Sequence, residues 1–256
     1  MNDGALPPAP AQSASRLWEV DTLRGLAVVM MVFYHLMWDL SYFGIYPAPV
    51  TRGGWLLFAR ATASLFLLLV GVSMTLAEAR AQEAGAKAAP LRQWYGRGLK
   101  LLGWGMVISL ITWPVLGRQF IAFGVLHLIG TALLLAPLLL RFRRYALALG
   151  GALLALGLTI RQLEASTAWL LPLGIRPPGY VSVDYFPLVP WLGFVVLGIA
   201  LGRSYLYRRS RKPAGPSRCP VLLRPLSFLG RHSLLIYLTH QPVLFAGFFL
   251  LGFRFP

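Results

Sequence analysis

The segment GLAVVMMVFYHLMWDLSYFGIY, residues 25–46, is apolar throughout except for His35 and Asp39. A helix rises 1.5 Å per residue, so a helix over this segment is long enough to cross about 30 Å of hydrocarbon. A bilayer is costly for ionisable side chains, and those found within a span are candidates for function. The segment therefore predicts a membrane-spanning helix that carries two candidate functional residues.

The composition of the whole chain agrees with a membrane protein. Of its 256 residues, 57% are hydrophobic and only 12% are charged, and the mean hydropathy is +0.65. Soluble domains have roughly 45–50% apolar and about 25% charged residues. These values argue against a water-soluble enzyme, and the high apolar and aromatic content excludes a disordered chain. The single Cys219 allows no internal disulfide and no cysteine metal cluster.

The rest of the sequence contains further apolar runs of membrane length. They are Trp55–Ala77, Leu101–Gly117, Phe120–Leu140, Tyr145–Ile160, Tyr185–Gly202 and His232–Gly252. With the first segment they predict an all-α polytopic membrane helix bundle of about seven transmembrane helices. We expect one transmembrane domain over residues 16–256 and a disordered N-terminal tail over residues 1–15.

The net charge of +16 is explained by the distribution of basic residues between the loops. Eighteen of the 24 Lys and Arg residues lie before residue 25 or within 78–100, 141–144 and 203–231, which all fall on one side of the bilayer. Cytoplasmic loops of membrane proteins carry an excess of Lys and Arg. This pattern predicts an N-terminus inside and a C-terminus outside. We therefore expect the protein to interact with the lipid bilayer and not with nucleic acid.

One face of the first span collects several polar side chains. Arg24 and His35 are eleven residues apart, so at 100° per residue they lie on the same helix face, and Asp39 is one turn further on. His35 is then roughly at mid-membrane. A nearby carboxylate can orient an imidazole and increase its basicity. We therefore expect His35 and Asp39 to be catalytic, with Asp39 orienting His35, although each also has a packing interpretation.

Two other spans each contain a histidine. His127 follows Gly124 near the outer end of the fourth span, and His240 precedes Pro242 in the middle of the last. Each histidine alone fits helix packing as well as function. Histidines at similar depth in three spans favour a shared site, so we also predict His127 and His240 to be catalytic. A metal bound by the histidines is the weaker alternative, and we expect no metal.

Four segments resemble transmembrane acyltransferases. The Arg24–His35 spacing is similar to that of the acyltransferase-3 family, and the longer context is most similar to bacterial relatives of the heparan-alpha-glucosaminide N-acetyltransferase catalytic domain. The matching segments are VDTLRGLA (20–27), FGVLHLIG (123–130), DYFPLVPWLG (184–193) and GRHSLLIYLTHQP (230–242). The chain departs from the lysosomal enzyme of this family at Ser41–Tyr46, where the counterpart of that enzyme's proposed catalytic histidine is missing.

The resemblance implies an enzyme that moves an acetyl or other short acyl group from cytosolic acyl-CoA to a sugar hydroxyl or amine of a glycan or glycolipid. It implies a location in the bacterial inner membrane. The candidates for binding the acceptor are Arg24, Arg60, Asp184, Tyr185 and Gln241. Basic residues at the inner interface are candidates for binding the phosphates of acyl-CoA, namely Arg24, Arg97, Lys100, Arg231 and His232.

Two alternatives remain open from the sequence. Histidines at mid-membrane also suit a proton-coupled transporter or exporter, although we find no inverted repeat of the kind that many transporters contain. A non-catalytic membrane scaffold, in which the histidines only pack helices together, is the other alternative. For the enzyme, His35 acts either as a general base or as a nucleophile that carries the acyl group. A homo-oligomer is possible in each case.

Overall fold

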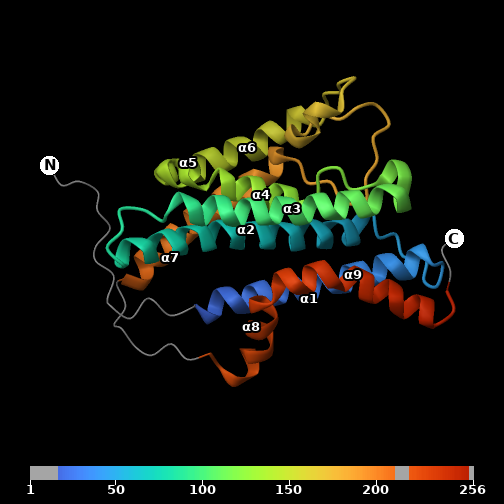
Figure 1. Ribbon diagram of the computed structural model, residues 1–256, viewed down its shortest axis with the longest axis horizontal. Coiled ribbons are helices and arrows are strands. Elements are labelled where there is room, and N and C mark those ends of the chain that lie inside the picture. The colour runs from blue at the N-terminus through green and yellow to red at the C-terminus, as the bar shows by residue number, and fades with distance from the viewer. Residues whose placement is uncertain (1–16, 211–218, 254–256) are drawn as a thin grey trace. The chain divides into compact units, whose positions relative to one another are not determined.

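The computed structural model describes residues 17–210 and 219–253, and it is built from helices (Figure 1). The α-helices are α1 (Trp18–Tyr42), α2 (Gly53–Glu83), α3 (Leu91–Leu116), α4 (Val125–Leu134), α5 (Ala136–Arg141), α6 (Ala146–Ile160), α7 (Leu188–Ser210), α8 (Arg224–Arg231) and α9 (Ser233–Leu250). Short 3₁₀ turns precede or follow several of them. The expectation of an all-α polytopic membrane protein is confirmed, and the expected tail over residues 1–15 lies outside the described residues.

Six helical segments of the described chain are long and apolar enough to span a membrane, namely α1, α2, α3, α6 together with the 3₁₀ turn before it (Arg143–Ile160), α7 and α9. The span expected over Phe120–Leu140 is different, because it is divided into α4 and α5 at Leu135. Pro137 lies in the first turn of α5, and a proline has no N–H to donate to the preceding turn. The count of about seven thus becomes six long helices and one interrupted segment.

The described chain forms two compact units. We call residues 17–69 with 219–253 the terminal unit and residues 70–210 the central unit. The terminal unit contains α1, the first half of α2, α8 and α9, and the central unit contains the second half of α2 and α3 to α7. The expected domain over residues 16–256 stays a prediction, and each unit is described by itself.

Glycines let α1 and α8 cross closely in the terminal unit. A Cβ atom added to Gly25 would collide with the main-chain oxygen of Leu226, and one added to Gly230 would collide with that of Asp21. Small residues permit such backbone approach between membrane helices. The crossing brings together two of the four segments that carry the family resemblance, VDTLRGLA and GRHSLLIYLTHQP.

α1 also lies beside α9, and both helices run in the same direction in Figure 1. An aromatic cluster joins their C-terminal ends. The ring of Phe43 lies 4.9 Å from that of Phe248 and 5.8 Å from that of Phe245, measured between centroids. Burial of such rings is a large apolar contribution. The cluster fixes the pairing of α1 and α9, on which the histidines of the terminal unit depend.

The central unit contains two close helix pairs, α3 with α4 and α6 with α7. Gly98 of α3 faces Gly130 of α4, and Gly150 of α6 faces Gly193 of α7. The second half of α2 packs on α7, where the Thr75 hydroxyl donates to the carbonyl of Ile199 at 3.3 Å. The loop between α6 and α7 contains a 3₁₀ helix at Ala168–Leu173. The main chain also forms an isolated parallel β-bridge between Glu164 and Arg176.

Candidate active site

His35 of α1 and His240 of α9 face each other in the terminal unit. Their ring centroids are 4.7 Å apart and the rings are inclined at 76°. In His35, Nδ1 lies 2.9 Å from the carbonyl oxygen of Met31. In His240, Nδ1 lies 2.7 Å from the carbonyl oxygen of Tyr237 and 3.2 Å from that of Ile236.

These contacts decide which nitrogen of each ring carries the proton. A carbonyl oxygen can only accept a hydrogen bond, so Nδ1 must be the donor in both rings. In a neutral imidazole the other nitrogen is then an unprotonated acceptor. The Nε2 atom of His240 is buried and has no hydrogen-bond partner among the described residues. Both rings therefore present a basic Nε2 atom, held in place through Nδ1.

Asp39 and Gln241 lie next to this pair, one on each helix. The amide nitrogen of Gln241 donates to Oδ1 of Asp39 at 2.7 Å, and Asp39 is fully buried. Within the described part of the chain, Oδ2 of Asp39 and Oε1 of Gln241 are buried without a partner. The expectation that Asp39 orients His35 needs correction, because helical side chains lean towards the N-terminus and His35 reaches back to Met31.

The four side chains form what we call the histidine cluster: His35, Asp39, His240 and Gln241. Its unsatisfied buried atoms are all acceptors, namely a carboxylate oxygen, an amide oxygen and an imidazole nitrogen. Buried polar atoms are nearly always hydrogen-bonded in proteins, so several neighbouring buried acceptors without a partner need an explanation. A ligand that carries hydroxyl or amino hydrogens would satisfy them.

His127 belongs to the central unit and has a different chemical state. The main-chain N–H of Gly124 donates to its Nδ1 at 3.2 Å, so Nδ1 carries no proton and Nε2 does. Nε2 lies 3.5 Å from the hydroxyl oxygen of Ser109, and the ring stacks on Phe123. Gly105 leaves room for the ring, since a Cβ there would lie 3.0 Å from it.

Both nitrogens of His127 are thus occupied within its own unit. The ring caps the start of α4 and packs α4 against α3, which is a structural part, and its catalytic role stays a prediction. The sequence had placed all three histidines among the catalytic candidates. Ser109, which supports His127, was missed because a serine in an apolar span gives no sign of its partner.

Asp184 and Tyr185 hold the loop before α7. Oδ2 of Asp184 accepts from the N–H of Val125 at 3.2 Å, at the first residue of α4. Burial raises the pKa of Asp184 to about 6, while the hydrogen bond from Val125 acts in the opposite direction. The Tyr185 hydroxyl donates to the carbonyl of Leu171 at 2.8 Å. Both residues therefore have structural partners, which sequence spacing could not indicate.

Arg24 lies at the crossing of α1 and α8. Its guanidinium forms an ion pair with Asp21 at 3.0 Å. Arg231 and His232 lie at the C-terminal end of α8 and are exposed. Each forms a hydrogen bond with a main-chain carbonyl of α8. Three of the five candidates for binding the donor thus belong to the terminal unit. Arg97 and Lys100 are exposed on α3 of the central unit, and Arg60 is exposed on α2.

A family model described as heparan-alpha-glucosaminide N-acetyltransferase, catalytic, matches residues 16–242. The chain belongs to this family. The matched range contains every member of the histidine cluster, and it contains His127 and Asp184 as well. Neither a curated protein nor a solved structure matches the chain. With its long apolar helices, this member of the heparan-alpha-glucosaminide N-acetyltransferase family is a multi-pass membrane protein of the acetyltransferase type.

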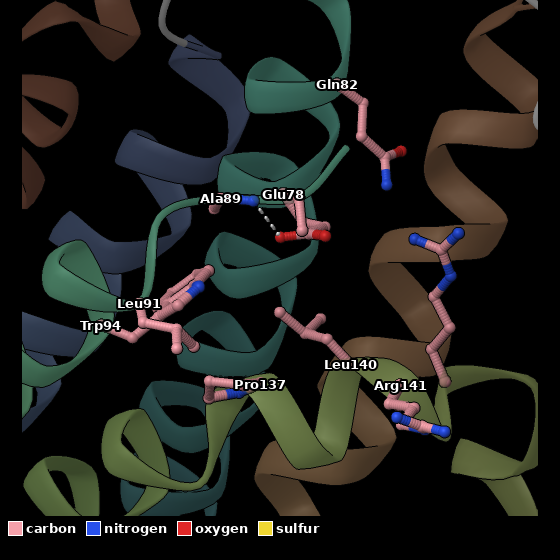
Figure 2. Close-up of a pocket in the computed structure, with 10 residues that line it drawn as sticks. Glu78, Gln82, Ala89, Leu91, Trp94, Pro137, Leu140 and Arg141 are labelled. Atoms are coloured by element: carbon pink, nitrogen blue, oxygen red, sulfur yellow. Dashed lines mark hydrogen bonds between the residues drawn. The ribbon is translucent and has the colours of Figure 1, made fainter. Parts of the chain in front are cut away.

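The central unit also contains a polar cavity of about 300 Å³ at the end of α2, which Figure 2 shows. Glu78 points into it and accepts from the N–H of Ala89 at 3.0 Å. Trp94, Arg141 and Arg143 also line it. The sequence reasoning missed this cavity, because Glu78 and the arginines fall in segments interpreted only as cytoplasmic charge. Among the described residues, no group of three His, Cys, Asp or Glu side chains is placed to hold a metal ion.

Proposed function

We propose that this protein transfers an acetyl or other short acyl group from acyl-CoA to a hydroxyl or amino group of a glycan or glycolipid, in a bacterial inner membrane. The observation that carries the proposal is the pair of imidazoles in the terminal unit. In each ring Nδ1 lies within hydrogen-bond distance of a main-chain carbonyl oxygen, and the Nε2 atom of His240 is buried without a partner among the described residues. The family supports acetyl transfer as the type of reaction.

His35 is the general base in this proposal. Its Nε2 takes the proton from the attacking hydroxyl or amine while the new bond to the thioester carbonyl forms. The carbon–sulfur bond then breaks, and the imidazolium returns the same proton to the departing CoA thiolate. One proton thus circulates within the site, and acyl-CoA and acceptor become CoA and acylated acceptor with no other reactant.

His240, Asp39 and Gln241 complete the site. Two imidazolium ions with centroids 4.7 Å apart would repel each other, so we assign one proton to the pair. His240 and the free oxygen of Gln241 accept hydrogen bonds from the acceptor substrate and position it. The Asp39 carboxylate stabilises the imidazolium electrostatically, in place of the direct orienting bond that the sequence suggested.

The test uses the full-length protein purified in detergent with radiolabelled acetyl-CoA and a crude envelope glycan extract. We expect label to move into the glycan fraction, and the double variant His35→Gln/His240→Gln to transfer label at least about a hundredfold more slowly. Accumulation of a substrate in proteoliposomes without an acyl donor, and no label transfer, would favour the proton-coupled transporter instead. The labelled product would also identify the acceptor.

A further inference from the structure

A second cavity of about 600 Å³ lies in the terminal unit, where α2 begins. It is lined by Phe33 of α1 and by Pro49, Arg52, Gly53, Gly54, Trp55 and Phe58. Its volume is within the usual range for sites that bind small molecules. Phe33 and His35 are two residues apart, so their side chains point to opposite sides of α1, and this groove is separate from the histidine cluster.

Three aromatic rings form the wall of the groove. The ring centroids of Phe33 and Trp55 are 6.0 Å apart, those of Phe33 and Phe58 are 6.1 Å apart, and those of Trp55 and Phe58 are 6.3 Å apart. Each ring therefore contacts the other two. Phe33 remains 47% exposed, so the wall is an open apolar surface that suits a hydrocarbon chain.

The loop between α1 and α2 holds this wall in place. The Tyr34 hydroxyl donates to the carbonyl of Val50 at 3.1 Å, and the Ser41 hydroxyl donates to that of Ala48 at the same distance. Ala48 and Val50 are buried. The loop is thereby folded back along α1, and α2 starts beside Phe33 instead of beyond the end of α1. The groove is a built feature of the unit.

Arg52 supplies a positive charge at one end of the groove. Its side chain is exposed, and among the described residues no carboxylate pairs with it. The first turn of α2 contains no acidic residue. A Cβ on Gly53 or Gly54 would have nothing within 4 Å, so the space around the guanidinium is open. Guanidinium groups bind phosphate through paired hydrogen bonds.

The length of α2 places this charge at the depth of the lipid headgroups. A helix of 31 residues is ~46 Å long, more than the ~30 Å hydrocarbon core, so both of its ends reach the headgroup region. A free anion would bind Arg52 but make no contact with the aromatic wall. A neutral hydrocarbon would contact the aromatic wall but leave the guanidinium of Arg52 without an anionic partner. We propose that this groove binds an anionic phospholipid, with its phosphate on Arg52 and an acyl chain along Phe33, Trp55 and Phe58.

Binding is measured on the full-length protein in detergent, without acyl-CoA, so that the result does not depend on the proposed enzyme activity. The probes are phosphatidylglycerol, phosphatidylcholine with the same chains, and inorganic phosphate, and the readouts are the unfolding temperature and retained lipid in native mass spectrometry. We expect phosphatidylglycerol to bind more tightly than phosphatidylcholine, and inorganic phosphate to have no effect on the unfolding temperature.

Variants separate the two parts of the groove. Arg52→Gln should weaken phosphatidylglycerol binding about tenfold, as expected for loss of a hydrogen bond to a charged group, and remove the preference over phosphatidylcholine. Phe33→Ala should weaken both lipids, and Phe58→Leu serves if Phe33→Ala does not fold. The matched control is Arg118→Gln, an exposed arginine of the central unit, which should bind like the wild type.

Several results would overturn the proposal. Equal affinity for the two lipids would show that the groove does not select an anionic headgroup over a zwitterionic one, and unchanged phosphatidylglycerol binding in Arg52→Gln would show that the guanidinium does not bind the phosphate. Stabilisation by inorganic phosphate at concentrations as low as those of the lipid would show a simple anion site. An effect of Arg118→Gln as large as that of Arg52→Gln would show general attraction by positive charge.

Discussion

The imidazole rings of His35 and His240 face each other in the terminal unit, with centroids 4.7 Å apart at an angle of 76°. The Nδ1–H group of each ring donates a hydrogen bond to a main-chain carbonyl of its own helix. The main chain thus sets the tautomer of both rings without the carboxylate–histidine pair common in hydrolases. A site built in this way presents two basic nitrogens for one proton.

If both rings handle the same proton, their contributions to catalysis should not be independent. We expect His35→Gln and His240→Gln each to lower the turnover number by about two orders of magnitude. The double variant should be little worse than the poorer single variant, because residues that act as a unit are strongly non-additive. The measurement is the turnover number of the four proteins. Multiplication of the two single effects would contradict a shared proton.

Asp39→Asn should cause a smaller loss than removal of either imidazole. The substitution keeps the size of the side chain and its hydrogen bond with Gln241, and it removes the negative charge that stabilises the imidazolium. We expect turnover to fall by about tenfold, which corresponds to about 1.4 kcal/mol. A comparison of the initial rates of Asp39→Asn and His35→Ala is sufficient. A loss in Asp39→Asn equal to that in His35→Ala would show that the carboxylate takes part in proton transfer itself.

His127→Ala should affect stability more than turnover. It leaves the N–H of Gly124 without its acceptor and removes the contact with Ser109, and an unsatisfied buried donor costs about 1–3 kcal/mol. Thermal unfolding measures the first effect, and turnover per folded molecule measures the second. A hundredfold loss of turnover with unchanged stability would return His127 to the catalytic residues.

Asp184 should make stability depend on pH. Its pKa in the folded protein is about 6, above the usual value of 3.8, so the folded protein binds this proton more tightly than the unfolded chain does. The resulting stabilisation is complete below about pH 3.8 and is lost as the pH rises through about 6. The unfolding temperature of the wild type, relative to Asp184→Asn, should therefore be higher at pH 5 than at pH 7. A constant difference would be evidence against a raised pKa of Asp184.

Much of the fold could be predicted from the sequence, because a bilayer requires long apolar runs. The break between α4 and α5 was the exception, where Pro137 interrupts a run that is apolar on both sides. Helix ends were also less certain, since α3 begins at Leu91, well before its apolar run at Leu101. The division of the chain into two units depends on contacts between distant residues, which apolar runs do not record.

For the candidate site, the sequence indicated candidate residues but not the hydrogen-bond partners of their side chains. His35, His127 and His240 look alike in a sequence, and only their partners distinguish a free Nε2 from an occupied one. The partner of His35 is a main-chain carbonyl, which every residue possesses. The partners of Asp184 and Gln241 are Val125 and Asp39, which are far away in the chain.

The most direct test of the central claim is acyl transfer by His35→Ala, measured with radiolabelled acetyl-CoA on protein whose folding is verified by its unfolding transition. If His35 is the base, turnover should fall by at least about a hundredfold while the unfolding temperature stays close to that of the wild type. Transfer at the wild-type rate by folded His35→Ala protein would contradict the mechanism.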